Sequence, residues 1–252
     1  MSLAGEYKRQ FGWRDWKNIF NALPGIQGQT VLDLGCGVGD IAAEFVARGG
    51  RVIGIDAHEE FLRQAQSRQL ANAEFRNIDL RNLPDLQIEI DGLWCSFTAA
   101  YFPDLPQVLT SWIRNLKPGG WIAITEIDDL FGHEPLSART RELFTAYYKE
   151  ALIAGRYDFQ MGRKLSDYSE ACGLKVSKVF TVEDREFCFR GPALPEVLDA
   201  WRARFQRMTL LRDFAGPYFD QPREEFLGCL MRADHVSFAR VQCCIAKKES
   251  IE

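Results

Sequence analysis

The chain has 252 residues, of which 46% are apolar, 26% charged and 12% aromatic. This composition fits a globular protein and excludes an intrinsically disordered one, because disordered chains lack the apolar side chains that offset the entropy of ordering. The 31 Lys and Arg residues are outnumbered by 35 Asp and Glu residues, so the chain lacks the basic surplus with which proteins displace counterions from nucleic acids.

The cysteine spacing and the apolar runs indicate the cellular compartment of the protein. None of the seven cysteines forms a Cys-x-x-Cys pair, which argues against a disulfide framework and a zinc cluster. The first ten residues do not have the pattern of a signal peptide, and no apolar run approaches the roughly 20 residues needed to span a bilayer. We therefore expect a reduced, cytoplasmic protein with no membrane partner.

Short β-rich runs alternate with helical patterns in the first half of the chain. The β-rich runs are residues 30–34, 51–55, 74–77, 92–96 and 121–127, and the helical patterns span 40–48, 59–69 and 105–115. This rhythm predicts right-handed βαβ crossovers and a parallel sheet covered by helices. The sequence therefore predicts a doubly wound, Rossmann-like α/β fold.

The pattern changes after residue 127. Helical segments at 137–154 and 163–172 precede a strand at 175–189, and helical segments at 194–214 and 223–233 precede a last strand at 237–246. Two late strands without a short crossover predict an antiparallel end to the sheet. The inserted helices are expected to form a cap over the sheet edge.

The sharpest signal is a glycine-rich loop, DLGCGVGD at 33–40, which joins a predicted strand to a predicted helix. Glycines at such a turn let the backbone approach a nucleotide ligand closely. A dinucleotide site has the spacing G-x-G-x-x-G, with the pyrophosphate at the helix N-terminus, whereas this loop has G-x-G-x-G. Asp33 would repel a pyrophosphate but suits a cationic amino group. The loop therefore favours S-adenosylmethionine, which carries an ammonium, a sulfonium and no phosphate, over NAD.

Two further acids follow the next two strands. Asp56 ends the second strand about 20 residues after Gly35, where an acid can accept hydrogen bonds from ribose hydroxyls. Asp79 ends the third strand and is expected to accept from the adenine amino group, with Leu80 as a backbone donor. These positions extend the predicted cofactor site along the carboxyl edge of the sheet.

In combination, these motifs resemble those of the class I S-adenosylmethionine-dependent methyltransferases, in the branch with small-molecule and quinone-type substrates. The resemblance covers roughly residues 28–127, including LKPGG at 116–120 as the turn before the fifth strand. It implies a seven-stranded sheet whose last strand is antiparallel. It also implies that the backbone around Gly35, Cys36 and Gly37 packs on the methionine moiety, and we expect Ala57 and Ser96 to complete the contacts.

The end of the fourth strand, WCSFT at 94–98, separates substrate classes. Methyltransferases of base amino groups have an Asn- or Asp-Pro-Pro-aromatic tetrapeptide here, and those of pyrimidine carbon 5 have a Pro-Cys nucleophile; this chain has neither. Metal-dependent catechol-type enzymes place an acid here and an Asp-Asn pair after strand five, which Asp128 and Asp129 imitate only in part. Cys95 and Ser96 supply no hard ligand for Mg²⁺, so we expect no metal.

The N-terminal segment at 6–16 is aromatic and amphipathic. Related enzymes close an N-terminal helix over the cofactor, often with an aromatic or Arg side chain on its carboxylate. Tyr7, Trp13 and Arg14 are the candidates for this contact. The alternative is a helix that packs on the domain with its charges in water.

The chemistry itself requires few residues. Methyl transfer is an in-line displacement at a carbon activated by the sulfonium, so the protein aligns the reactants and, where needed, removes a proton from the acceptor. Candidate bases are His133, Glu126 and Tyr101, of which His133 has the intrinsic pKa suited to neutral pH. The alternative for His133 is a solvated surface turn.

Two features of the late helices bear on the substrate. Aromatic residues between 147 and 161 suit an apolar or aromatic substrate, or simply core packing. The arginines of the helical block, Arg202, Arg204, Arg207 and Arg212, are interleaved with acids and predict a solvated face rather than an RNA site.

We therefore expect an enzyme that transfers a methyl group from S-adenosylmethionine to oxygen, nitrogen or carbon of a small molecule, leaving S-adenosylhomocysteine. We expect one domain over 1–252, with a helical segment at 1–27, a cofactor-binding half at 28–127, and the end of the sheet with the cap at 128–252. A tRNA- or protein-directed methyltransferase, a catalytically silent cofactor-binding module and a dehydrogenase are the alternatives, the last disfavoured by Asp33.

Overall fold

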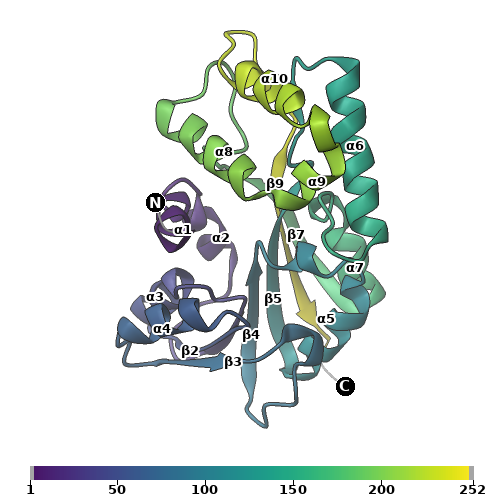
Figure 1. Cartoon of the computed structure of the whole chain (residues 1–252). Coiled ribbons are helices and arrows are strands. Elements are labelled where there is room, and N and C mark those ends of the chain that lie inside the picture. The colour runs from purple at the N-terminus through teal and green to yellow at the C-terminus, as the bar shows by residue number, and fades with distance from the viewer. Residues whose placement is uncertain (1–2, 250–252) are drawn as a thin grey trace.

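Seven strands form one mixed sheet in the order β3-β2-β1-β4-β5-β9-β7 (Figure 1). The structure is a computed structural model that describes residues 3–249, apart from the side chains of residues 3, 4 and 7. The strands are β1 (Thr30–Leu34), β2 (Arg51–Asp56), β3 (Ala73–Asn77), β4 (Ile90–Ser96), β5 (Leu116–Asp128), β7 (Leu174–Val182) and β9 (Arg240–Lys248). The first five are parallel, and β9 lies antiparallel between β5 and β7. This confirms the predicted doubly wound sheet and its antiparallel last strand.

The apolar runs of the central strands are buried on both faces of the sheet. Val31 of β1 faces one core with helices α2 (Trp16–Ala22) and α3 (Asp40–Ala47), while Leu32 faces a second core with α5 (Leu105–Arg114) and α7 (Leu165–Ala171). Cys243 and Cys244 in β9 divide between the same two cores, and both are free thiols. Parallel strands covered on both faces require such continuous apolar runs. Helix α4 (Glu59–Ser67) packs near β3 at the sheet edge.

Three predicted boundaries differ from the observed ones. Residues 117–120, expected as a turn, lie inside β5 as a bulge, since Ile90 pairs with Leu116 but Gly92 pairs with Trp121. The strand expected at 175–189 ends at Val182, because the Asp184 side chain accepts from the two following amides and turns the chain. The helix expected at 194–214 is two helices, α8 (Pro195–Arg207) and α9 (Thr209–Ala215).

The late helices gather beyond the carboxyl end of β5 (Figure 1). They are α6 (Ala138–Ile153), α8, α9 and α10 (Asp220–Leu230), with a small hairpin of β6 (His133–Glu134) and β8 (Val236–Ser237). Their core is aromatic: Phe131 stacks on Phe144 at 4.1 Å between ring centroids and also contacts Phe226. We call these elements the cap. Helix α1 (Leu3–Phe11) lies beside α2, close to α8 of the cap (Figure 1).

Four short 3-10 turns complete the structure: η1 (Leu80–Asn82), η2 (Ala99–Tyr101), η3 (Gly162–Lys164) and η4 (Gly216–Tyr218). Within residues 3–249, no helix has both the length and the apolar character needed to cross a bilayer.

His133 lies in the core of the cap and not in a solvated turn. Its ring is 1% exposed and sits between Trp201 and Phe226, with Nδ1 at 2.9 Å from Nε2 of His235. His235 donates through Nδ1 to the Gly191 carbonyl, so its Nε2 accepts from His133. Burial, and then repulsion from His235, lowers the pKa of His133 to about 3. The alternative of a solvated turn is therefore wrong, because the ring fills an aromatic core.

The buried histidine pair predicts loss of stability in acid. The unfolded chain binds more protons than the folded chain between pH 6.5 and 3, so the free energy of unfolding falls as the pH falls through this window. We expect His133 to account for about 3 kcal/mol between pH 7 and pH 4, measured by urea unfolding.

The variant His133→Phe removes the titrating group and should flatten the profile by about that amount. The matched control is His58→Gln, which changes the exposed histidine and should leave the profile as it is. A His133→Phe profile as steep as that of the native protein would contradict the assignment.

Candidate active site

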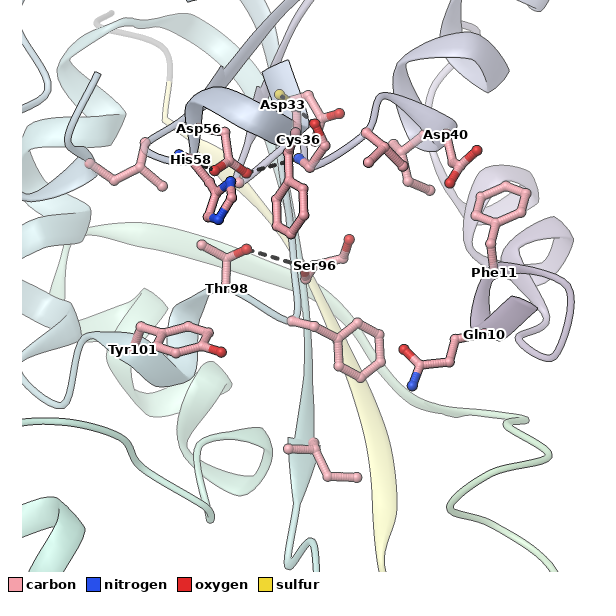
Figure 2. A pocket seen from close by; sticks show the side chains of 18 of the residues that line it. Gln10, Phe11, Asp33, Cys36, Asp40, Asp56, His58, Ser96, Thr98 and Tyr101 are labelled. Carbon is pink, nitrogen blue, oxygen red and sulfur yellow. Dashed lines mark hydrogen bonds between the residues drawn. The ribbon is translucent and has the colours of Figure 1, made fainter. Parts of the chain in front are cut away.

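A cavity of about 680 Å³ lies at the carboxyl ends of β1, β2 and β4 (Figure 2). It brings together residues from the glycine-rich loop, the N-terminal segment and the cap. The expected cofactor contacts that line it are Arg14, Asp33, Gly35, Cys36, Gly37, Asp56, Ala57, Asp79, Leu80 and Ser96. Trp13 is not among the residues that line it, and the side chain of Tyr7 lies outside the described part of the structure.

The glycine-rich loop has three glycines with positive φ angles, and two of them line the cavity. Gly35 has φ +76°, and a Cβ there would lie 2.1 Å from Oγ1 of Thr98, so only glycine fits. Gly37 has φ +52° and nothing within 4 Å of where a Cβ would be, because it borders the open cavity. Its amide donates to Oδ2 of Asp56 at 2.9 Å. The loop is thus held against the end of β2 with its backbone facing a ligand.

Two of the strand-end acids are fixed by backbone amides. Besides Gly37, Asp56 accepts at Oδ1 from the amide of His58 at 2.8 Å. Asp79 caps η1 by accepting from the amide of Arg81 at 2.9 Å. Both carboxylates therefore keep one orientation at the cavity wall, where they can accept hydrogen bonds from a ligand.

Asp33 is the exception, because its carboxyl group is not fully paired. It is 2% exposed, and its Oδ2 is buried without a hydrogen-bond partner among the described residues. Burial, and then repulsion from Asp56, raises the pKa of Asp33 to about 8. A buried acid of this kind is stabilised by a cation that enters the cavity. An ammonium group fits this position.

Arg14 reaches the cavity from the segment between α1 and α2. Its Nε donates to Oδ2 of Asp184 at 2.7 Å, and its guanidinium lies 3.9 Å from the centroid of the Phe97 ring. Among the described residues, no other acceptor takes its remaining N–H groups, which face the cavity. Trp13 instead packs against Arg9, with 5.1 Å from the guanidinium carbon to the ring centroid.

The wall away from the glycine-rich loop is mostly apolar. It contains the side chains of Phe97, Tyr101, Phe102, Ile127, Leu130, Tyr157 and Phe187, together with Arg204. Tyr101 of η2 and Tyr157 meet edge to face, with 4.9 Å between ring centroids. This wall suits a ligand with an apolar or aromatic body.

Arg204 does not lie on a solvated face, and that expectation is wrong. Its Nε donates to Oε1 of Glu186 at 3.2 Å, and its side chain is mostly buried. The signal was present in the sequence: Arg204 stands three residues after Trp201 and one before Phe205, on the buried face of α8. Of the residues found at this wall, sequence reasoning missed Phe187, which was expected to lie in a strand at 175–189, and Leu130, whose loop shows no periodicity.

The three candidate bases occupy different positions relative to the cavity. Tyr101 lines the cavity. Glu126 is fully buried outside it, accepting from the amides of Ala100 at 3.1 Å and Ile127 at 2.9 Å, and burial raises its pKa to about 7. Glu126 thereby fixes η2, which carries Tyr101. His133 is enclosed in the cap core and is not among the residues that line the cavity, so the geometry does not support it as a base.

Residues 3–249 include no cluster of three His, Cys, Asp or Glu side chains that could hold a metal ion.

Comparisons with known proteins agree with this geometry. The methyltransferase-domain family matches residues 31–120. A ubiquinone biosynthesis O-methyltransferase of Pseudomonas fluorescens is 30% identical over 162 residues, which are 62% of this chain and 68% of that protein.

Two solved structures show the same fold at lower identity. An S-adenosylmethionine-dependent methyltransferase from Mesorhizobium loti is 18% identical with a TM-score of 0.56, over 92% of this chain and 97% of that one. Phosphoethanolamine N-methyltransferase 2 of Haemonchus contortus, in complex with S-adenosylmethionine, is 20% identical with a TM-score of 0.58, over 93% of this chain and 52% of that one. The chain belongs to the class I S-adenosylmethionine-dependent methyltransferases and is an enzyme with S-adenosylmethionine as its cofactor.

Proposed function

We propose that this enzyme methylates a small molecule with an apolar or aromatic body, at an oxygen atom. The observation that carries the proposal is the cavity itself. It must hold the cofactor along the glycine-rich loop, and what remains is bounded by aromatic side chains of η2 and of the segments that follow β4, α6 and β7. A space of about 680 Å³ shared with a cofactor suits a small acceptor rather than a folded macromolecule. The relative from Pseudomonas fluorescens is an O-methyltransferase, which favours oxygen as the acceptor atom.

The cofactor contacts follow from the acids and from the loop. When bound, S-adenosylmethionine supplies an activated methyl group. Asp33 would pair with its ammonium, Asp56 would accept from the ribose hydroxyls, and Asp79 would accept from the adenine amino group while the Leu80 amide donates. The backbone at 35–37 would pack on the methionine moiety, with Ala57 and Ser96 beside it.

Arg14 would hold the methionine carboxylate. Its unused N–H groups form a planar fork, which matches a carboxylate with two parallel hydrogen bonds. Asp184 and the Phe97 ring fix the plane of this fork at the cavity wall.

On the acceptor side the chain contributes orientation more than proton transfer. Tyr101 is the candidate base that lines the cavity, and Glu126 holds its turn in place. An acceptor hydroxyl that ionises readily needs little more than alignment with the activated methyl group.

The pKa of Asp33 gives a direct test of its role. In the free enzyme Asp33 is mostly protonated at pH 7, and an ammonium beside it would lower its pKa, so binding of S-adenosylhomocysteine should release a proton. Titration calorimetry in buffers of different ionisation enthalpy should therefore give different apparent enthalpies. In Asp33→Asn this difference should disappear, and a buffer-dependent enthalpy that survives in the variant would remove Asp33 from the site.

Arg14→Gln should weaken S-adenosylhomocysteine binding by about ten- to a hundredfold, the worth of one or two charge-assisted hydrogen bonds. The matched control is Arg185→Gln, an exposed arginine next to Asp184 that does not line the cavity. Both affinities are measured by calorimetry. If the Arg14 variant bound S-adenosylhomocysteine as tightly as the native enzyme, the methionine carboxylate would have to be held by another residue.

The activity is tested with methyl-labelled cofactor and a metabolite extract, followed by identification of the labelled product. We expect the label in a small molecule, as the methyl group of a chemically stable methyl ether. Label only in tRNA or protein would favour a macromolecular substrate, and tight cofactor binding with no labelled product would favour a catalytically silent module. Either result would overturn the proposal.

A further inference from the structure

Two arginines converge on the aromatic wall of the cavity. The guanidinium carbon of Arg14 lies 5.8 Å from the centroid of the Phe187 ring, and that of Arg204 lies 5.0 Å from it. Both arginines line the cavity, although one comes from the N-terminal segment and the other from α8 of the cap. The guanidinium groups of Arg14 and Arg204 thus both approach the Phe187 ring, and both side chains line the cavity.

The acids that hold these arginines are hidden from the cavity. Asp184 pairs with Arg14 and Glu186 pairs with Arg204; both acids are buried, and neither is among the residues that line the cavity. The Asp184 side chain also accepts from the amides of Glu186 and Phe187 at 2.7 and 3.0 Å. The segment 184–187 thus keeps its carboxylates in the interior and leaves guanidinium groups at the wall.

The acidic and the basic side chains that line the cavity come from different parts of the chain. The acids, Asp33, Asp40, Asp56 and Asp79, belong to the glycine-rich loop and the ends of the first strands. The basic side chains, Arg14 and Arg204, belong to the N-terminal segment and to α8 of the cap. An acceptor with an acidic group would be repelled by the acids and would find hydrogen-bond donors on the arginines.

We propose that Arg204 binds an anionic substituent, a carboxylate, on the aromatic acceptor. This inference rests on the proposed function, in which Arg14 serves the carboxylate of the cofactor. An anion enters an apolar cavity only if a partner offsets the loss of its hydration, and a partly buried guanidinium is such a partner. At long range the charge of Glu186 cancels that of Arg204. Selectivity for an anionic acceptor therefore comes from direct hydrogen bonds between Arg204 and the acceptor at the wall.

The test compares benzoate with benzamide, which share a ring and a shape but differ in charge. Binding of each probe is measured by calorimetry on the full chain saturated with S-adenosylhomocysteine. The native enzyme should bind benzoate about ten- to a hundredfold more tightly than benzamide. Arg204→Gln should abolish this preference and leave the affinity for S-adenosylhomocysteine unchanged.

The matched control is Arg202→Gln on the same helix, where the side chain is exposed and paired with Asp199, and it should keep the preference. The double variant Glu186→Gln with Arg204→Gln removes the buried carboxylate that the single change leaves unpaired, so it tests the same point if the single variant fails to fold. Equal binding of the two probes by the native enzyme, binding of neither, or a preference that survives in Arg204→Gln or in the double variant would overturn the inference.

The proposed function fails in a different way. It fails if labelled cofactor yields no small-molecule product, whatever the probes do. A native enzyme that methylates a small molecule but does not distinguish benzoate from benzamide would retain the proposed function and lose only the anionic acceptor.

Discussion

Parallel pairing of β1 with β2 and β4 is the constraint on which the site depends. Leu34 of β1 pairs with Ile55 on one side and Cys95 on the other, so three strands end at one level. The residues that follow these three strand ends therefore lie at the same edge of the sheet, whatever their separation in the sequence. Since β1 is buried on both faces, a shift of one residue would exchange Asp33 with an apolar neighbour and place a carboxyl group in the opposite core.

The site also depends on buried polar groups that the protein does not fully satisfy. Asp33 keeps an unpaired oxygen, and Arg14 keeps unused donors, at different places in one cavity. Leaving such groups unpaired costs stability, and the cost is recovered when a ligand of complementary charge binds. A zwitterionic amino-acid moiety, with one ammonium and one carboxylate, has the charges that both groups lack.

The cofactor half could be predicted from the sequence because its signals are local. The glycine spacing and the strand-end acids at Asp56 and Asp79 depend on neighbours within a few residues, and parallel topology then brings them together. The cap could not be predicted in the same way. Whether His133 is solvated or enclosed depends on Trp201 and Phe226, which are distant in sequence, and the same holds for the pairing of Arg204 with Glu186. Helical periodicity placed Arg204 beside buried residues, but only the fold reveals what it faces.

The segment 184–187 contacts two of the expected cofactor residues, Arg14 through the Asp184 side chain and Trp13 through the Arg185 amide, and its two acids determine how far apart two cationic groups stand. Its turn is held by the Asp184 carboxylate on its own backbone amides, so this spacing is a property of the backbone and not of a freely rotating side chain. Such a segment fixes the distance between the two guanidinium groups. Substitutions in the aromatic wall would change the shape that the cavity admits, whereas the length of ligand that fits between the two guanidinium groups would change only if the chain after β7 were rebuilt.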